Sequence, residues 1–194
     1  MQAFYLSNLV ACILGVLIFN AQVSEQLAVN ISEQEDSQGV TARASCEKSI
    51  AGHKCKRIKD RCYCFVNTQL SWEQADTFCR SNKKRLLSIE TADEQADVSS
   101  VLIPIVLKDD IAKKIGVWTC GSYIPQKKVF VWSSTQKPFT FVNWFYNEPI
   151  VGSLDQCLRV RIVPESLTSG RWASLSCDQW LPFICQDDPG TIKP

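Results

Sequence analysis

The chain has 194 residues, enough for one domain with additional segments, and its apolar share of 45% is ample for a hydrophobic core. The formal net charge is +1, so the overall charge selects no class of charged partner, nucleic acid included. Ten cysteines in a chain of this size indicate an oxidising compartment, because cytosolic thiols stay reduced.

The N-terminus carries an apolar run of 11 residues, Leu9 to Phe19. The run is shorter than the roughly 20 residues that span a bilayer, and it is typical of a signal peptide that ends near Ala21. It departs from that pattern because no Lys or Arg precedes it and because Phe19 is large for its position. A buried core helix is the alternative, but polar and acidic sequence follows at once. We therefore predict a signal peptide over residues 1–21 and a secreted, extracellular protein without a membrane span.

Residues 22–45 are polar, contain four acidic residues and have no aromatic residue. Such a segment cannot bury enough apolar surface to order itself, so we predict a flexible polar arm. The arm contains the only glycosylation sequon of the chain, Asn30-Ile31-Ser32. We expect Asn30 to carry a glycan. The domain itself is expected over residues 46–188, with a tail over 189–194.

The first half of this domain predicts a strand and a helix. Residues 46–64 are rich in cysteine and in basic residues, and a strand begins at Tyr63 and runs to Asn67. Ser71-Trp72-Glu73-Gln74 has the pattern of a capping box, so a helix should run from there to about Ser81. Asn82 can take the left-handed position after the helix. Apolar residues at helical spacing should face the core: Trp72, Ala75, Phe78 and Cys79.

Further elements follow in chain order. Leu86, Leu87 and Ile89 indicate a short strand, and Thr91-Ala92-Asp93-Glu94 is a second capping box. The helix that follows should cover Ala96, Val98, Val101 and Leu102 and end by Pro104. Residues 105–114 have no clear pattern. Strands are expected at 115–119 and 129–132, and the six tryptophans between Trp72 and Trp180 predict one aromatic core. Helices first and strands later favour the α+β class.

The stretch from Phe141 to Cys185 predicts a binding platform. An aromatic loop containing Glu148 and Pro149 is followed by two short strand-like runs, each with a cysteine. Loops held on a rigid scaffold usually carry function.

This stretch resembles the second half of a C-type lectin-like domain. The shared features are the Glu-Pro loop, the acidic Asp155 two places before Cys157, and Trp172 followed by Ser-Cys and a last cysteine. Further matches extend the resemblance over Cys62 to Gln186. One is the start of the helix, Leu70–Ala75, with Cys79. Another is the core strand Val117–Gly121, which is similar to that of secreted insect-type C-type lectins, although this chain has Cys120 where they have Ser. The resemblance implies two helices, a small antiparallel sheet and a long loop region, stapled by disulfides.

The resemblance also implies the disulfides Cys79–Cys185 and Cys157–Cys177. With Cys12 removed in the signal peptide, five cysteines remain: Cys46, Cys55, Cys62, Cys64 and Cys120. Cys46 and Cys55 are both candidate partners of Cys62. Since five is odd, at least one cysteine is free or pairs outside the chain, as in a disulfide-linked dimer.

In sugar-binding members of that family the long loop holds calcium and a monosaccharide together. Calcium prefers six to eight oxygen ligands. Here Glu148, Pro149 and Asp155 are retained, but Ile150 replaces an Asn, and Ala173-Ser174 replaces Asn-Asp. We therefore interpret Glu148 and Asp155 as vestigial residues that cap or bridge the loop, and we expect no metal and no cofactor.

Two other sets of residues offer alternative sites. The basic residues from Lys54 to Arg61, together with Lys83-Lys84-Arg85, could hold sulfated glycans or anionic lipid, or be a solvated face. His53 lies near Cys55, Cys62 and Cys64, but the spacing is not a zinc pattern and the compartment favours disulfides. A single histidine also argues against a hydrolase.

The sequence thus predicts a secreted recognition module and no enzyme. The resemblance implies binding of extracellular glycans or a microbial surface, with a role in innate immunity, through a degraded calcium site. The alternative is a protein-binding module that uses the same loop platform without binding sugar.

Overall fold

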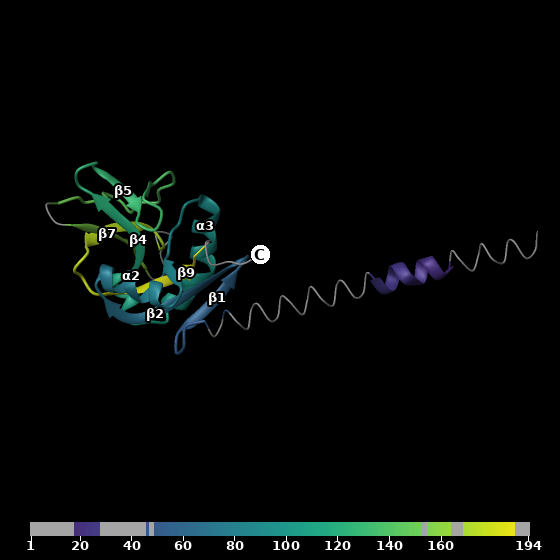
Figure 1. The fold of residues 1–194 in the computed structure, drawn as a ribbon. Helices are drawn as coiled ribbons and strands as arrows, with labels where there is room; N and C mark the ends of the chain where they lie inside the picture. The colour runs from purple at the N-terminus through teal and green to yellow at the C-terminus, as the bar shows by residue number, and fades with distance from the viewer. Residues whose placement is uncertain (1–17, 28–45, 47–48, 153–154, 164–168, 189–194) are drawn as a thin grey trace, which may run out of the picture. The chain divides into compact units, whose positions relative to one another are not determined.

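The computed structural model describes residues 18–27, 46, 49–152, 155–163 and 169–188 (Figure 1). The chain divides into two units, residues 1–44 and 45–194. In the first unit, residues 18–27 form a helix with exposed side chains, where the sequence analysis expects the end of a signal peptide and a flexible arm. Glu25, Gln26 and Leu27 are good helix formers, a local preference that composition does not weigh. No helix among the described residues is long and apolar enough to cross a membrane.

In the second unit a β-hairpin is joined to the last strand of the chain. β1 (Lys54–Ile58) pairs antiparallel with β2 (Arg61–Leu70), and β2 pairs antiparallel with β9 (Leu181–Asp187). The start and the end of the domain are therefore adjacent. β2 is longer than the predicted strand, because pairing on both sides carries it through polar residues at both ends.

Helix α2 (Trp72–Ser81) begins as the sequence predicts. The Ser71 side chain accepts a hydrogen bond from the Gln74 amide, and the Gln74 side chain accepts one from the Ser71 amide. The expected left-handed position of Asn82 is wrong: its φ is −95°, and Lys83 has the positive φ of 57° instead. The Asn82 side-chain amide donates to the Phe78 carbonyl at 2.9 Å, so this residue closes the helix with its side chain.

The second predicted helix is a composite of three segments that continues past Pro104. α3 (Ala92–Asp97) is followed by a π-helical turn, η1 (Val98–Leu102), and by α4 (Ile103–Val106). The expected end at Pro104 is wrong, because the π-helical turn starts a new helical segment in which proline occupies an early position and needs no amide partner. The second capping box is only half formed. Thr91 caps the Glu94 amide, but the Glu94 carboxylate accepts from the Glu90 amide rather than from Thr91.

The remaining strands complete one sheet with the order β1-β2-β9-β4-β5-β6. The other elements are β3 (Lys84–Leu86), α5 (Ala112–Ile115), β4 (Val117–Ile124), β5 (Val129–Trp132), β6 (Lys137–Pro138), β7 (Gln156–Val160) and β8 (Trp172–Ser176). β3 pairs with β9, while β7 pairs with both β4 and β8. All strand pairs are antiparallel except β4 with β9, which are parallel at Trp118 and Phe183.

The predicted strand over 115–119 begins later than expected, at Val117. Ile115 ends α5, and Gly116 turns the chain at a φ of 86°. A side chain at this position would also collide with the Val160 carbonyl oxygen. Similarly, the strand predicted to reach Ile89 ends at Leu86, although the next residues stay buried.

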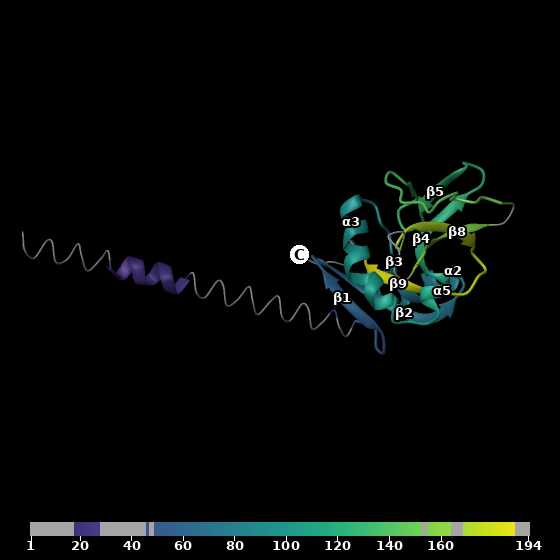
Figure 2. The same ribbon diagram turned by 180° about the vertical axis from the view of Figure 1, so that it is seen from behind.

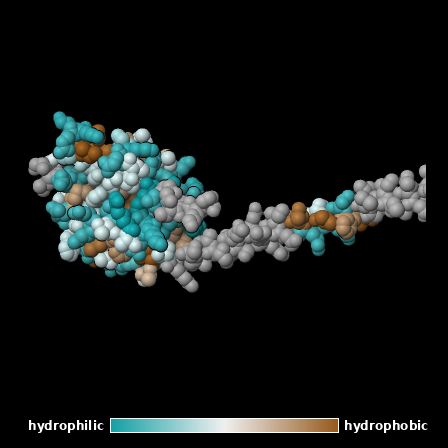
Figure 3. Space-filling model, in the orientation of Figure 1, coloured by the Kyte–Doolittle hydropathy of each residue, from teal (hydrophilic) through white to brown (hydrophobic). Residues whose placement is uncertain are grey.

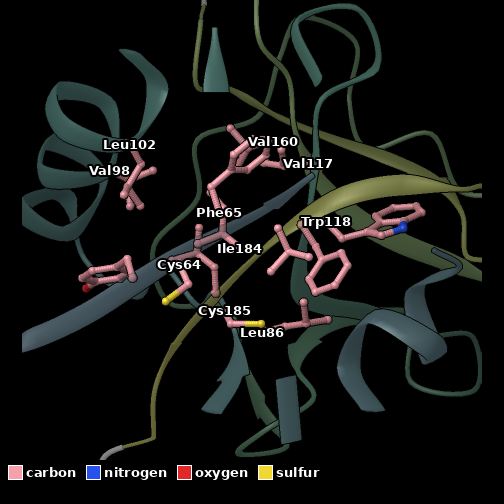
Figure 4. Packing of buried hydrophobic residues seen from close by; sticks show 14 of the residues in the cluster. Cys64, Phe65, Leu86, Val98, Leu102, Val117, Trp118, Val160, Ile184 and Cys185 are labelled. Atoms are coloured by element: carbon pink, nitrogen blue, oxygen red, sulfur yellow. The ribbon is translucent and has the colours of Figure 1, made fainter. Parts of the chain in front are cut away.

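The hydrophobic core packs the helical segment against the strands, β2, β9 and β4 among them (Figure 4). Figure 4 shows Val98 and Leu102 of the helical segment on one side, strand residues such as Phe65 and Ile184 in the middle, and Trp118 on the other side. Trp118, Trp132 and Trp172 are fully buried, but Trp180 is 63% exposed, so the aromatic core does not extend to all six tryptophans. Seen from both sides, the β1–β2 hairpin lies at one end of the domain and β5 at the other (Figures 1 and 2).

Candidate functional site

The long loop over residues 141–152, called here the Glu-Pro loop, is fastened to the start of β8. The Trp172 amide donates to the Asn143 carbonyl at 2.8 Å, and the Phe145 amide donates to the Trp172 carbonyl at 2.7 Å. The Trp172 indole N–H donates to the Gln95 side chain at 2.8 Å, which links β8 to α3. The Arg161 guanidinium lies 4.1 Å from the centre of the Phe145 ring. The loop is therefore built onto the tryptophan core.

The Glu148 carboxylate is engaged by its own loop and by β8. Its Oε2 accepts hydrogen bonds from the Ile150 amide at 3.0 Å, the Ser174 amide at 3.0 Å and the Ser174 hydroxyl at 2.8 Å. Three donors around one carboxylate oxygen are enough to fix the side chain in place. The arrangement bridges the Glu-Pro loop to β8.

Ser174 adds a second contact between the same two segments. Its hydroxyl oxygen lies 2.8 Å from both the amide nitrogen and the carbonyl oxygen of Ile150. Because a hydroxyl has one proton, it donates either to Glu148 or to the Ile150 carbonyl, and it accepts from the Ile150 amide in both cases. The Ile150 side chain itself is 66% exposed. The two segments are thus held by polar groups at the positions where the resemblance places calcium ligands.

Asp155 is placed differently from Glu148. It is exposed, and its carboxylate makes no hydrogen bond or ion pair with the part of the chain that the structure describes. Only its backbone carbonyl is used, accepting from the Cys177 amide at 3.2 Å. Among the described residues, neither Asp155 nor Glu148 belongs to a group of three side chains that are close enough to hold one metal ion.

The cysteines form four disulfides within the described residues. Cys79–Cys185 and Cys157–Cys177 are the two pairs that the resemblance implies. The sequence left Cys46 and Cys55 as candidate partners of Cys62. In the structure Cys62 pairs with Cys46, and Cys55 pairs with Cys64. The group Cys55, Cys62 and Cys64 is compact, but all three sulfur atoms are in disulfides and none is a thiolate ligand.

Cys120 is the free cysteine of the described region, and it is fully buried in β4. Burial raises the pKa of its thiol to about 11, so very little thiolate exists at neutral pH. A reactive or cross-linking cysteine would need an exposed sulfur atom, and the sulfur of Cys120 is buried. Sequence counting identifies an unpaired cysteine but cannot locate it.

Part of the basic set considered from the sequence is used inside the fold, while Lys54 and Lys56 stay exposed, so a surface for anionic ligands stays a prediction. Lys84 and Arg85 are each 7% exposed, and the Lys84 ammonium lies 2.6 Å from the Asp187 carboxylate. Lys59 pairs with Asp97 at 2.7 Å, and Arg61 pairs with Glu94 at 2.8 Å. These charges join the hairpin to the helical segment and to β9. The single histidine, His53, lies edge-on to the Phe78 ring with 6.0 Å between ring centres.

A groove that sequence reasoning missed lies beside Asp155. It has a volume of about 520 Å³, within the usual range of small-molecule sites. Its walls come from five places: the start of α2, the end of β4, the turn after β5, the start of β7 and the turn after β8. Residues so distant in sequence have no common pattern, so no motif could have indicated this groove.

Several sequence predictions fall outside the described residues. They are the sequon at Asn30, most of the apolar run of the predicted signal peptide, most of the polar arm and the tail over 189–194, so all of these stay predictions. The surface of the described face is mostly polar, with apolar residues scattered among polar ones (Figure 3).

Comparisons with known proteins agree on one family. The family described as "Lectin C-type domain" matches residues 68–187. Lymphocyte antigen 75 of Mus musculus is 31% identical over 126 residues, which are 64% of this chain but only 7% of that protein's length. C-type lectin mosGCTL-7 of Aedes aegypti is 26% identical over 127 residues, covering 65% of this chain and 82% of that protein.

A solved structure shows the same fold. It is described as the "Ca2+-independent C-type lectin SPL-2 from Saxidomus purpuratus" and aligns with a TM-score of 0.55 at 23% identity. The alignment covers 70% of this chain and 91% of that chain.

Proposed function

Because the chain belongs to the C-type lectin domain family, we propose that it is a secreted, extracellular recognition module that binds carbohydrate, on glycans or a microbial surface, without calcium. The observation that carries this proposal is the Glu148 carboxylate, whose Oε2 already accepts from the amides of Ile150 and Ser174 and lies within hydrogen-bond distance of the Ser174 hydroxyl. A calcium ion would have to compete with these donors.

The surrounding donors do not fit calcium either. The ion takes six to eight oxygen ligands, mostly from carboxylates and carbonyls. Ile150 and Ala173 offer no side-chain oxygen, and the Ser174 hydroxyl is neutral and already bonded within the loop. Glu148 and Asp155 are not part of any group of three potential ligands in the described region. Such a pair, completed by water, would bind the ion weakly.

The similar proteins support a lectin that works without the metal. The name of mosGCTL-7 describes a C-type lectin, and the description of SPL-2 states independence of Ca²⁺. The same fold therefore accommodates a lectin that does not depend on the ion. A binding role agrees with the placement of His53, the one histidine of the chain, edge-on against the Phe78 ring.

A glycan array read with calcium and with EDTA tests the proposal. We expect the same glycans to be bound in both conditions. The matched control is the triple variant Ile150→Asn, Ala173→Asn and Ser174→Asp, which restores the missing oxygen ligands. Binding by the unmodified protein that disappears in EDTA would show that the proposal is wrong, and so would the absence of any bound glycan.

A second candidate function, protein binding, is favoured by apolar side chains on the Glu-Pro loop. Tyr146 is 81% exposed, and Val142, Ile150 and Val151 are also exposed. Exposed aromatic and branched residues on a rigid loop are typical of protein interfaces. If Tyr146→Ala and Ile150→Ala abolish capture of a protein partner while the array shows no glycan, the second function replaces the first.

A further inference from the structure

The groove beside Asp155 is a cavity with fixed walls. The α2 wall is attached to the β8 side, because the Trp72 amide donates to the Cys177 carbonyl at 3.0 Å. The Trp72 indole N–H donates to the Thr119 carbonyl of β4 at 2.7 Å. The Cys157–Cys177 disulfide joins the two walls formed by β7 and by the turn after β8. A ligand would therefore meet a preformed site and would not have to order it.

The charges that line the groove are mostly negative. Asp76 and Arg80 form an ion pair at 2.7 Å and so compensate each other. The carboxylates of Glu73, Asp155 and Asp178 also line the groove, and within the described residues they make no ion pair. Three uncompensated carboxylates around one concave surface concentrate a negative potential there.

The neutral lining groups suit a hydroxylated ligand. Ser122 and Gln136 offer a hydroxyl and an amide group, which both donate and accept hydrogen bonds. The Ser133 hydroxyl oxygen is buried and has no hydrogen-bond partner in the described part of the chain, so its side chain would have to shift to meet a ligand. The half-buried rings of Trp72 and Tyr123 supply apolar surface for the C–H face of a sugar.

From these observations we propose that the groove binds a saccharide that carries a free amino group. Its ammonium is attracted by the negative potential of Glu73, Asp155 and Asp178 together, and its hydroxyls bond to the serine and amide groups. The inference rests on the proposed function for the saccharide part of the ligand, but its site is separate, since Glu148 does not line the groove. A metal ion is the wrong occupant, because no three of these carboxylates approach closely enough to share one.

The test is a titration of the full chain with three probes. These are the trisaccharide of glucosamine, its fully N-acetylated form and trilysine, each in EDTA at low salt and at a pH where the sugar amine is protonated. We expect the glucosamine trisaccharide to bind most tightly and to weaken as salt is added. The triple variant Glu73→Gln, Asp155→Asn and Asp178→Asn should bind it at least about eightfold more weakly, since the loss of each exposed charge interaction should weaken binding about two- to fivefold and the three losses multiply.

Asp93→Asn is the matched control for Glu73→Gln, because both acids lie exposed in the first turn of a helix and only Glu73 lines the groove. The control should bind as the unmodified protein does. Equal affinity for the acetylated form, tighter binding of trilysine, or full binding by the triple variant would each overturn the proposal. Thermal melts of all variants separate loss of the site from loss of the fold.

These outcomes also separate the groove from the proposed function. If the array shows glycan binding but the glucosamine trisaccharide does not bind, only the groove proposal fails. If the trisaccharide binds and the triple variant does not bind it, the groove is established whichever other glycans the array shows.

Discussion

The Glu-Pro loop and the groove beside Asp155 each contain one acidic residue that the resemblance assigns to a single calcium site. Glu148 is surrounded by amide and hydroxyl donors from its own chain, while the Asp155 carboxylate has none among the described residues. One acid is therefore used to hold the loop, and the other faces solvent beside a cavity. Two acids that the resemblance assigns to one ligand set thus have different surroundings in this structure.

The difference follows from the replacements at two positions. Ser174 has a short hydroxyl side chain that reaches both Glu148 and the Ile150 backbone. Ile150 has no polar side-chain atom, so its exposed side chain offers nothing to a metal. A loop that satisfies its polar groups internally needs no ion to order it.

The largest expected effect comes from the disulfide that touches both regions. Replacing Cys157 and Cys177 by Ser opens a loop of 20 residues and should lower the free energy of unfolding by about 3 kcal/mol in the chain-entropy model. Denaturant unfolding measures it. Replacing Cys55 and Cys64, nine residues apart and outside the groove, is the matched control. The control should lose stability but still bind the glucosamine trisaccharide. Equal loss of trisaccharide binding in both variants would contradict the assignment of the groove.

The next effect concerns Cys120 of β4, the strand whose later residues Ser122 and Tyr123 line the groove. Its folded-state pKa is about 11, against an ordinary value of 9.0. Because the folded pKa is raised, the stabilisation is complete below pH 9 and is lost as pH rises from 9 toward 11, at most by about 3 kcal/mol. The free energy of unfolding, measured between pH 9 and 11, should therefore fall. The fall should be smaller in Cys120→Ser, because serine does not titrate in this range.

Thiol labelling supplies an independent check on the same residue. Cys120 is fully buried, so the folded protein should react slowly and the denatured protein fast. Rapid labelling of the folded protein at Cys120 would contradict the buried placement.

A smaller effect separates the two acidic residues themselves. Glu148→Gln weakens three hydrogen bonds to a charged acceptor, so we expect the free energy of unfolding to fall by about 1 to 3 kcal/mol. Asp155→Asn should change it by less than about 0.5 kcal/mol, because an exposed carboxylate without partners adds little. Thermal melts of the two variants compare them directly. Similar losses in both would mean that Asp155 also holds the loop.

The sequence predicted the frame of the domain well, because local patterns determine it. The Ser71 capping box forms with both of its hydrogen bonds, and the strand over 129–132 lies where expected. The errors arise where tertiary contacts override local signals. Pro104 continues the helical segment because a π-helical turn precedes it, and Lys84 and Arg85 are buried because Asp187 and Ser134 accept from them.

The candidate site was only half predictable for a similar reason. The replacement of calcium ligands can be read at Ile150 and Ser174, since it depends on residue types alone. The hydrogen bonds from those positions to Glu148 depend on how the loop and β8 meet, which no spacing specifies. The groove joins residues from Glu73 to Asp178 and exists only in the folded chain.

The smallest expected effect is that of calcium on the Glu-Pro loop. A ligand that binds only the folded state adds RT ln(1 + [L]/Kd), so a site at 100 times its Kd would add about 2.7 kcal/mol, or several degrees in Tm. With Glu148 held by three donors and Ile150 without an oxygen, we expect a Kd far above millimolar calcium and almost no change in Tm. The variant with Ile150→Asn, Ala173→Asn and Ser174→Asp should gain stability from calcium, because Ser174→Asp removes a donor from Glu148 and adds a carboxylate. A gain of several degrees in the unmodified protein, reversed by chelator, would mean that Glu148 exchanges its loop partners for the ion.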